Sequence, residues 1–365
     1  MAKIGLLGGT FDPIHNGHIR NAKAAYLQLG LEEVWFIPVL NNPFTKEITA
    51  SNEERIEMIR LATKDYPYMK ICDIELNADV HVKSYTYDTL TKLNHMYDHE
   101  FYFIIGYDQA EQFEKWFQAD KINTLATLVV VERLGYHKHP NIEKFKMIEL
   151  EVEATDISST AIKNGDVSAL DPKVLHYMMM HSIYTKTMIR PLMSKKRYMH
   201  SLSVADTARE FALNNNVDSN KAYIAGLLHD IAKEMPMEEM KDLMMRHYPE
   251  HLDASVPVWH QWLSAFLAKE KYLVDDTEIL QAITNHTTGS VEMSLLDMCV
   301  YCADKYEPTR DFDASKERAM CNQDIVEGFR YALKDFYEFS KKKNRKIDKV
   351  FFEIYKKYVE EGTHG

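Results

Sequence analysis

The sequence GGTFDPIHNGH, residues 8–18, follows directly on the apolar run at residues 4–7 and is the most informative part of the chain. Its two adjacent glycines allow the backbone to approach an anion closely. Its two histidines, His15 and His18, can donate hydrogen bonds to phosphoryl oxygens. A helix beginning near Asn16 would direct its positive end toward the same place. The stretch therefore predicts a strand, a glycine turn and a helix that together bind phosphate.

Short apolar strands alternate with helical patterns from this stretch to about residue 186. Runs such as 53–63 and 85–96 repeat apolar residues with a period near 3.6, which is typical of helices. This alternation predicts an α/β doubly wound parallel sheet, Rossmann-like, with ligands beyond the carboxyl ends of the strands. The strands are expected at residues 4–7, 34–38, 69–76, 101–105, 127–131 and 147–152.

The strand pattern ends near residue 187, and only helical patterns follow. A chain of 365 residues is long enough for two domains that each bury a core. We therefore predict an α/β domain at 1–186 and an all-α domain at 187–365. Its helices are expected at residues 194–213, 221–235, 238–246, 260–269, 277–285, 294–306, 325–341 and 349–361.

The composition excludes several classes of protein. A formal net charge of -11 argues against a general nucleic-acid binder, so a protein of this charge that binds nucleotides needs local positive charge or a metal. The first residues do not resemble a secretory signal and no apolar run reaches transmembrane length, so we expect a cytoplasmic protein with no membrane partner. Cys299 and Cys302 could form a redox or zinc pair, but their spacing on one helix, without further ligands nearby, favours buried, inert thiols.

The chemistry that suits residues 8–18 is nucleotidyl transfer, in which a phosphate oxygen attacks the α-phosphorus of ATP. The attacking phosphate is already charged at neutral pH, so no strong general base is needed. Catalysis then depends on positioning and on stabilising the charge that develops on phosphorus and pyrophosphate. His15, His18 and the start of a helix provide fixed donors for that purpose, and Thr10 adds a hydroxyl.

The stretch GGTFDPIHNGH resembles the first motif of the nucleotidyltransferase family that includes nicotinate-nucleotide adenylyltransferase. Residues 157–163, ISSTAIK, are similar to that family's second nucleotide motif, with Lys163 where members usually carry Arg. Lys keeps the charge but loses the bidentate geometry. The resemblance implies ATP with Mg²⁺ and catalytic roles for His15 and His18. It also implies ATP contacts from Gly8, Gly9, Thr10, Phe11, His15, His18, Ser158, Ser159, Thr160 and Lys163.

Three further segments, 84–90, 103–116 and 133–135, resemble the parts of these enzymes that bind a pyridine mononucleotide. Bacterial members usually carry Pro-Pro-His-Lys after the second strand, whereas this chain reads NPFTK at 42–46, which leaves Lys46 as the phosphate partner. The implied acceptor contacts are Lys46, Thr86, Tyr87, Gly106, Asp108, Trp116 and Arg133.

Pantetheine-phosphate adenylyltransferases share the first motif in a Thr-x-Gly-His version. His15 and the Tyr-Thr-x-Asp-Thr segment at 85–89 favour the pyridine acceptor instead. We therefore expect transfer of AMP from ATP to nicotinate mononucleotide, which gives deamido-NAD and pyrophosphate.

The helical half carries four histidines and two aspartates on, or at the ends of, predicted helices. Neighbours on a helix point about 100° apart, so His229 and Asp230 are placed to flank a metal cluster rather than to stack on one position. Histidines with carboxylates suit iron, manganese, zinc and nickel. The candidate metal ligands are His200, His229, Asp230, His260, His286 and Asp304.

The order of these six residues is that of the HD phosphohydrolase superfamily. Segments 228–234, 285–289 and 303–310 resemble the bacterial HD family of symmetrical diadenosine tetraphosphate hydrolases. The resemblance implies a dinuclear transition-metal site, with iron favoured and manganese, zinc or nickel as the other candidates. One ion would be held by His200, His229, Asp230 and Asp304, and the other by His260 and His286 with Asp230 as the bridge. His260 departs from the common context, since it is followed by Gln-Trp rather than Gly-Pro.

Two cations near this set are candidates for substrate phosphate. Lys233 in the His-Asp-x-x-Lys run is placed to reach the attacked phosphate, and the alternative for it is a solvated helix face. Arg310, after Glu-Pro-Thr, is an anion contact. Asp230 and Lys233 are the residues expected to act in hydrolysis. The reaction would split diadenosine tetraphosphate into two ADP.

Together the two halves predict a bifunctional enzyme whose partners are small nucleotides: ATP, nicotinate mononucleotide and diadenosine tetraphosphate. One alternative is that the HD half is a nucleotide sensor, or hydrolyses another nucleotide. Another is that it only mediates oligomerisation. The sequence leaves open the metal, the formation of a homo-oligomer and the use of nicotinamide mononucleotide.

Overall fold

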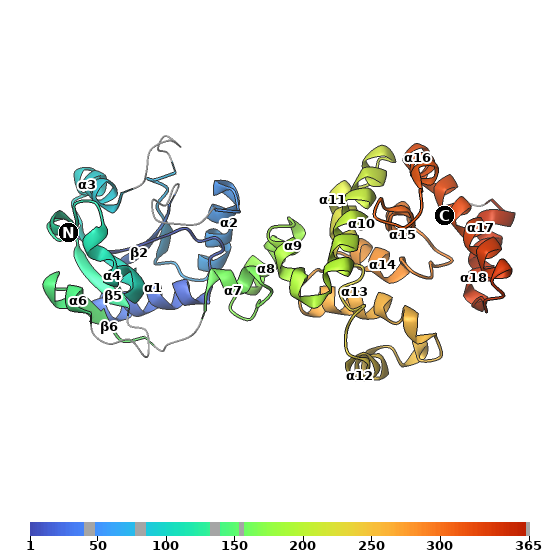
Figure 1. Cartoon of the computed structure of the whole chain (residues 1–365). Coiled ribbons are helices and arrows are strands. Elements are labelled where there is room, and N and C mark those ends of the chain that lie inside the picture. Colours follow the sequence, from blue (N-terminus) through green and yellow to red (C-terminus); the bar gives the residue numbers. More distant parts are fainter. Residues whose placement is uncertain (40–47, 77–84, 132–138, 153–156, 363–365) are drawn as a thin grey trace. The chain divides into compact units, whose positions relative to one another are not determined.

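A computed structural model describes residues 1–39, 48–76, 85–131, 139–152 and 157–362 (Figure 1). The chain forms two compact units, Met1–Val174 and Leu175–Gly365. Residues 175–186, which the sequence analysis assigned to the first domain, belong to the helical unit. Two of the expected acceptor contacts, Lys46 and Arg133, lie outside the described residues.

The first unit contains a six-stranded sheet whose neighbouring strands are all parallel, which confirms the predicted doubly wound fold. The strand order is β3-β2-β1-β4-β5-β6, so the order reverses between β1 and β4. Ligands of such sheets bind at this reversal, beyond the carboxyl ends of the strands. The strands are β1 (Lys3–Gly9), β2 (Glu33–Pro38), β3 (Met69–Ile71), β4 (Glu100–Gly106), β5 (Thr127–Val131) and β6 (Ile148–Leu150).

The core of this unit follows from alternation along the strands. Ile4 and Leu6 of β1 point to the same face as Phe101 and Phe103 of β4, and they pack in one cluster with Leu90 of α3. The strands lie among the helices of this unit (Figure 1). The helices are α1 (Asn16–Leu29), α2 (Asn52–Thr63), α3 (Thr86–Met96), α4 (Tyr107–Glu111), α5 (Ala119–Ile122), α6 (Pro140–Lys144) and α7 (Ser159–Lys163).

Strands β3 and β6 are shorter than expected, because each is an edge strand with one neighbour. β3 pairs with β2 only as far as Ile71, and β2 itself ends at Pro38. One further backbone hydrogen bond follows, from the Cys72 N–H to the Phe36 carbonyl oxygen, and the predicted strand over 69–76 is too long.

The second unit is helical, as predicted, and its described residues, up to 362, contain helices and no strand. The helices are α8 (Pro172–Met180), which begins in the first unit, α9 (Thr185–Ile189), α10 (Lys195–Asn214), α11 (Ser219–Leu228), α12 (Met237–His247), α13 (His260–Glu270), α14 (Thr277–Asn285), α15 (Leu295–Tyr306), α16 (Ser315–Gln323), α17 (Ile325–Lys342) and α18 (Lys349–Tyr355). The helix expected over 221–235 ends at Leu228. Three helices were not foreseen: α8 and α9, which precede the expected set, and α16, whose sequence is largely polar.

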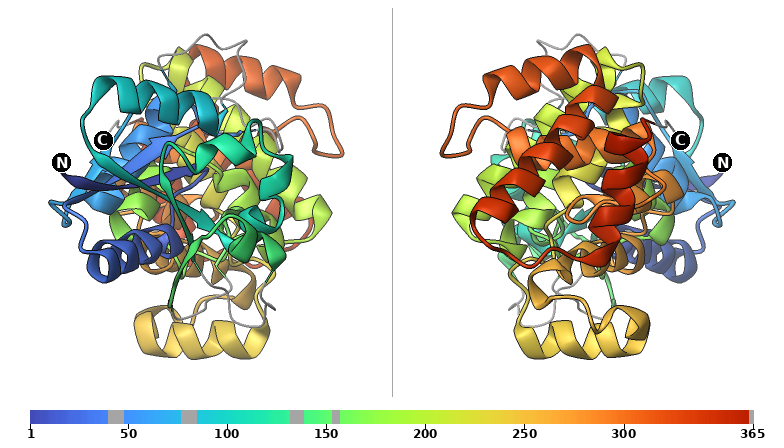
Figure 2. Two further views of the ribbon diagram at one scale, coloured as in Figure 1. Left: turned by 90° about the vertical axis from the view of Figure 1, so that its left-hand side faces the viewer. Right: turned by 90° about the vertical axis from the view of Figure 1, so that its right-hand side faces the viewer.

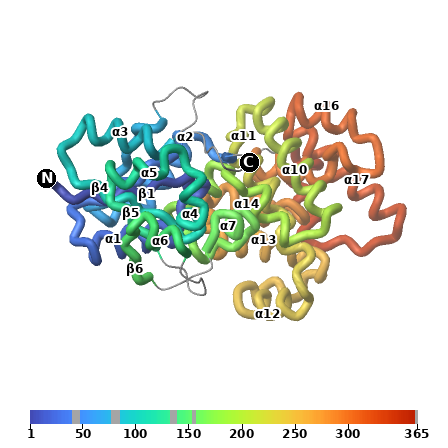
Figure 3. Tube along the Cα trace, turned by 60° about the vertical axis from the view of Figure 1, so that its left-hand side comes forward, coloured from blue at the N-terminus to red at the C-terminus, as the bar shows by residue number. Residues whose placement is uncertain are grey.

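Helices α10 and α11 approach each other closely, and this contact positions two of the candidate ligands. A Cβ at Gly226 would lie 2.6 Å from the Cα of Ala205, so only glycine fits there. Helix α12 packs against α13 at the lower side of Figures 1 and 3, and its Met240 and Met244 share a buried cluster with Leu263 of α13. Helices α17 and α18 lie side by side (Figure 2).

Among the described residues no helix is both long and apolar enough for a membrane span. Cys299 and Cys302 are free and buried on α15. Burial raises the pKa of both thiols, which disfavours the reactive thiolate and agrees with the inert role expected from the sequence.

Candidate functional sites

The stretch at residues 8–18 lies at the carboxyl end of β1, beside the reversal of strand order. Gly8 and Gly9 end the strand, and His15 is the N-cap of α1. Phe11 and Ile14 are fully buried and hold the loop against the core. The turn thus directs the start of α1 toward the position where this fold binds phosphate.

His15 and His18 form a stacked pair. Their ring centroids are 3.7 Å apart, and the His15 backbone N–H donates to His18 Nδ1 at 3.2 Å. Burial lowers the pKa of His15 to about 4 and holds that of His18 well below its usual range. Because Nδ1 of His18 accepts a hydrogen bond, the proton of the neutral ring is on Nε2. The pair therefore offers neutral N–H donors rather than positive charge.

The second nucleotide segment is joined to this loop by direct contacts. Ser159 Oγ donates to the carbonyl oxygen of Pro13 at 3.0 Å, and Ser158 caps α7 by accepting from the Ala161 N–H. The Lys163 ammonium group forms an ion pair with Asp12. The sequence analysis assigned Lys163 to an ATP phosphate, whereas the structure shows it against a carboxylate. Thr160 is exposed at the first turn of α7.

The described acceptor residues belong to α3, β4 and the segment after it. Gly106 ends β4, the parallel neighbour of β1, and Asp108 is exposed two residues later. Trp116 is half-buried, with its ring centroid 6.2 Å from that of Phe103. Thr86 begins α3, and the ring of Tyr87 lies 6.0 Å from that of Phe117. Thr10, an expected ATP contact, is half-buried in the loop after β1.

The six candidate metal ligands of the helical unit converge, although they come from five separate parts of the chain. Asp230 is at the centre. Its Oδ2 lies 3.4 Å from His229 Nε2 and 3.8 Å from His200 Nε2. Its Oδ1 lies 3.2 Å from His260 Nε2 and 3.6 Å from His286 Nε2. One carboxylate therefore faces two histidines on each side, which is the arrangement that a bridging ligand requires.

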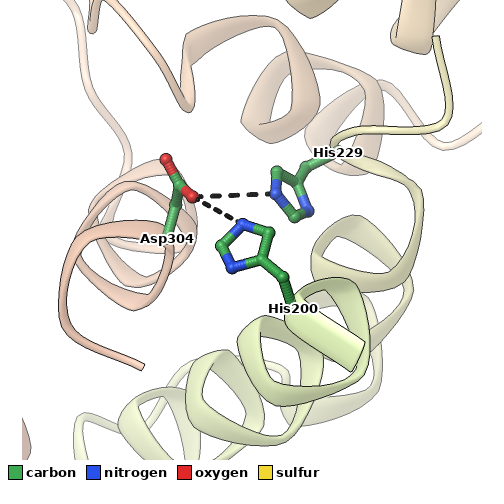
Figure 4. A group of neighbouring side chains, drawn as sticks. All are labelled: His200, His229 and Asp304. Carbon is green, nitrogen blue, oxygen red and sulfur yellow. Dashed lines mark ion pairs between the residues drawn. The ribbon is translucent and has the colours of Figure 1, made fainter. Parts of the chain in front are cut away.

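Asp304 completes one side of the cluster. His200 and His229 both point to the same Asp304 oxygen, with Nε2–Oδ1 distances of 3.0 and 3.8 Å (Figure 4). These three side chains come from α10, the end of α11 and α15. Their ligand atoms all lie within 4.8 Å of one another, as do those of a second group formed by His229, Asp230 and His286.

Each of the four histidines is oriented through its other ring nitrogen. Nδ1 of His229 lies 2.7 Å from the Gly226 carbonyl oxygen, and Nδ1 of His286 lies 2.6 Å from that of Ile283. The Nδ1 atom of His260 is 2.9 Å from the Pro257 carbonyl oxygen. When Nδ1 holds the proton of these rings, as ligation of a metal through Nε2 requires, each Nε2 directs its lone pair toward the cluster.

The fourth histidine, His200, is oriented by a side chain that the sequence analysis did not single out. Its Nδ1 lies 2.9 Å from Oε1 of Glu307, which is buried and also accepts from the N–H and hydroxyl of Thr309. Burial alone would raise the pKa of Glu307, but its bonds to His200 and Thr309 lower it to about 2. Glu307 is therefore an anion that supports a ligand from outside the cluster.

The electrostatics of the cluster fit a divalent metal. Burial would raise the pKa of Asp230, yet His229, His260 and His286 hold it well below its usual range. Burial lowers the pKa of His260 to about 4, so this ring is neutral, as a ligand must be. Nε2 of His200 and of His229 is buried without a hydrogen-bond partner in the part of the chain described. Such buried lone pairs, beside two carboxylates, suit a divalent cation.

Two cationic side chains, Lys233 and Arg310, and the amide of Gln261 lie around the cluster. The Lys233 Nζ lies 3.0 Å from both ring nitrogens of His260, and Arg310 Nη2 lies 2.8 Å from Asp304 Oδ1. Gln261 is buried and accepts from the Thr288 N–H at 3.2 Å, which joins the start of α13 to the loop after His286. This contact gives the unusual residue after His260 a structural role, which the sequence pattern did not show.

Comparison with known proteins matches one family to each half of the chain. Residues 6–165 match the family described as cytidylyltransferase-like, and residues 197–309 match the HD domain family. A Mycoplasma pneumoniae protein named probable nicotinate-nucleotide adenylyltransferase/Ap4A hydrolase is 32% identical over 312 residues, covering 84% of this chain and 88% of that protein. A Mycoplasma genitalium protein of the same name is 33% identical over 316 residues, with the same coverage.

The first half has separate relatives as well. A Bacillus mycoides protein named probable nicotinate-nucleotide adenylyltransferase is 41% identical over 166 residues, covering 45% of this chain and 85% of that protein. The two-domain relatives align with most of the chain, across both units. The chain therefore belongs to the nicotinate-nucleotide adenylyltransferase/Ap4A hydrolase family and joins a cytidylyltransferase-like domain to an HD domain.

Proposed function

We propose that the chain is a bifunctional enzyme. Its first unit transfers AMP from ATP to nicotinate mononucleotide, and its second unit hydrolyses diadenosine tetraphosphate to two ADP. The observation that carries the hydrolase proposal is the position of Asp230, whose two oxygens each face a different pair of histidines. The stacked His15–His18 pair at the end of β1 supports the transferase proposal.

In the transferase unit, the protein's contribution is to position ATP and to stabilise charge. The Nε2–H of His18, the His15 ring and the first N–H groups of α1 are donors for phosphate oxygens, and ATP would enter with Mg²⁺. Since the two rings are neutral, they stabilise developing charge through hydrogen bonds. Thr86, Tyr87, Gly106, Asp108 and Trp116, with Lys46 and Arg133 beyond the described residues, remain the proposed acceptor contacts.

In the hydrolase unit, His200, His229, Asp230 and Asp304 would hold one divalent cation, and His260 and His286 a second, with Asp230 shared. Two such cations supply a nucleophilic water at neutral pH and offset phosphate charge. Lys233 and Arg310 lie at the edge of the cluster and are placed to contact the substrate phosphates. The donor set of four imidazoles and two carboxylates suits iron, manganese, zinc or nickel. Among these metals, the family resemblance favours iron.

The transferase proposal is tested with purified protein, ATP and Mg²⁺, offered nicotinate mononucleotide, nicotinamide mononucleotide or phosphopantetheine in separate reactions. We expect deamido-NAD from the first acceptor at the highest kcat/KM. Preferential adenylylation of phosphopantetheine would overturn the pyridine assignment. His18→Ala should lower adenylyl transfer and leave hydrolysis unchanged, because the two sites lie in different units.

The hydrolase proposal is tested by elemental analysis of the metal together with ADP release from diadenosine tetraphosphate. Asp230→Ala should lose bound metal and hydrolysis together while adenylyl transfer continues. Hydrolysis that persists in this variant would refute the bridging role. A wild-type protein that binds the dinucleotide without releasing ADP would support the sensor alternative, and a wild-type protein without metal would support a purely structural helical unit.

A further inference from the structure

Arg197 contacts the centre of the cluster, although nothing in the sequence pattern assigned it a role. It lies in the first turn of α10, three residues before His200, so both side chains are on the same face of the helix. Its Nη1 lies 2.6 Å from Oδ2 of Asp230, the oxygen that also faces His200 and His229. Its side chain is 29% exposed, so it reaches both the buried carboxylate and solvent.

Three cations from three separate elements contact members of the cluster: Arg197 from α10, Lys233 after α11 and Arg310 after α15. Three carboxylates, those of Asp230, Asp304 and Glu307, lie among them. The three positive charges balance the three negative charges, so these side chains would leave the charge of bound divalent cations uncompensated. A polyanionic substrate is the ligand that would balance it.

We propose that Arg197 binds the polyphosphate of the substrate at this site, on the side formed by His200 and His229. This inference rests on the proposed hydrolase function and names a further contact for its substrate. Arg carries five N–H donors in a planar fork that matches phosphate oxygens. Nη1 contacts Asp230, while the buried Nε of Arg197 has no hydrogen-bond partner among the described residues. The guanidinium group is therefore only partly bonded, on a side chain that is 29% exposed beside the Asp230 carboxylate.

A purely structural role explains these contacts less well. The start of α10 is already fixed, because Ser194 caps it and donates through its hydroxyl to Glu234 at 2.8 Å. What Arg197 adds is a guanidinium group at the edge of the cluster, on a side chain that is partly exposed to solvent.

The test compares Arg197→Gln and Arg197→Lys with Lys196→Gln, which removes one positive charge from the exposed neighbouring position of the same helix. Metal content is measured by elemental analysis in each full-length, metal-loaded protein. Equilibrium binding of a non-hydrolysable methylene-bridged analogue of diadenosine tetraphosphate is then measured by calorimetry, with adenosine as the ligand that lacks phosphate. Kinetics of ADP release give KM and kcat separately.

We expect Arg197→Gln to keep its metal, to bind the analogue about 10- to 100-fold more weakly and to bind adenosine as before, since a charged hydrogen bond to phosphate is lost. Arg197→Lys should lose less, and Lys196→Gln should match the wild type. Unchanged analogue binding in Arg197→Gln would overturn the proposal, and so would a loss of metal that accounts for the weaker binding. Absence of analogue binding in the wild type would also overturn it, whereas binding without ADP release would overturn only the proposed hydrolysis.

Discussion

Replacement of Arg55 by methionine is expected to destabilise the first unit strongly. Arg55 lies on α2 and is completely buried. Its Nη1 donates to the carbonyl oxygens of Thr10 and Val39, at 2.7 and 2.8 Å, and its Nη2 donates to Asn52 Oδ1 at 2.6 Å. This one guanidinium group therefore joins the loop after β1, which contains the candidate ATP contacts, to the residue that follows β2.

The size of the effect follows from the two backbone carbonyls. Methionine keeps an unbranched apolar side chain but provides no donor, so both carbonyl groups lose this donor inside the protein. A buried polar group without a partner costs about 1–3 kcal/mol, which gives about 2–6 kcal/mol for the pair. Because Thr10 belongs to the phosphate-binding loop, the KM for ATP should rise as the loop loses its support.

Hydrogen exchange followed by mass spectrometry measures this loss in the full chain. Peptides from β4 report the opening of the first unit, and peptides from α15 report the second unit as an internal reference. The matched control is Arg60→Met on the same helix, whose side chain is 66% exposed and pairs with Glu57, so a change below about 1 kcal/mol is expected. Equal effects of the two substitutions would refute the reasoning.

Three further predictions concern stability, metal affinity and pH. Gly226→Ala should destabilise the helical unit by about 1–3 kcal/mol, because the new Cβ would meet the Ala205 backbone at 2.6 Å and this clash exceeds the gain in helix propensity. Thermal unfolding measures the change in stability, and a stabilised variant would contradict the prediction. Glu307→Gln should weaken metal binding about 10- to 100-fold, because the anion that orients His200 is lost. Competition with a chelator measures the metal affinity, and a wild-type affinity in this variant would count against the orienting role of Glu307. Burial lowers the pKa of His15 from 6.5 to about 4. The neutral ring therefore contributes fully to the free energy of unfolding above pH 6.5, and this contribution is lost as the pH falls toward 4. The loss between pH 7 and pH 5 is about 2 kcal/mol. Unfolding of the first unit in His15→Gln should show a correspondingly smaller dependence on pH, and an unchanged dependence would show that His15 is not the group that titrates.

The order of secondary structure was predictable because it is encoded in local periodicity. The central strands β1, β4 and β5 and the helices α14, α15 and α17 lie within a few residues of the expected ranges. Errors occurred where neighbours decide the outcome. The edge strands β3 and β6 have one neighbour each, so their length depends on pairing that local periodicity does not encode. The polar helix α16 has no apolar face to reveal it.

The six candidate metal ligands could be found from the sequence because their residue types and order are distinctive. Their supporting residues could not. Glu307 lies 107 positions from His200, and Arg55 lies 45 positions from the Thr10 carbonyl that it binds. A single glutamate or arginine forms no periodic pattern from which its contacts could be predicted. Its hydrogen-bond partner is determined only by how the secondary-structure elements pack.

The sequence by itself determined the two-part organisation, the phosphate-binding turn and the set of imidazoles and carboxylates, since these depend on residue type and short-range spacing. Only the tertiary structure decided that Asp230 faces histidines on both sides, that Lys163 contacts Asp12, and that Arg197 reaches the cluster. Directions of side chains from separate helices depend on how those helices pack, and close packing is a property of the whole fold rather than of any local segment.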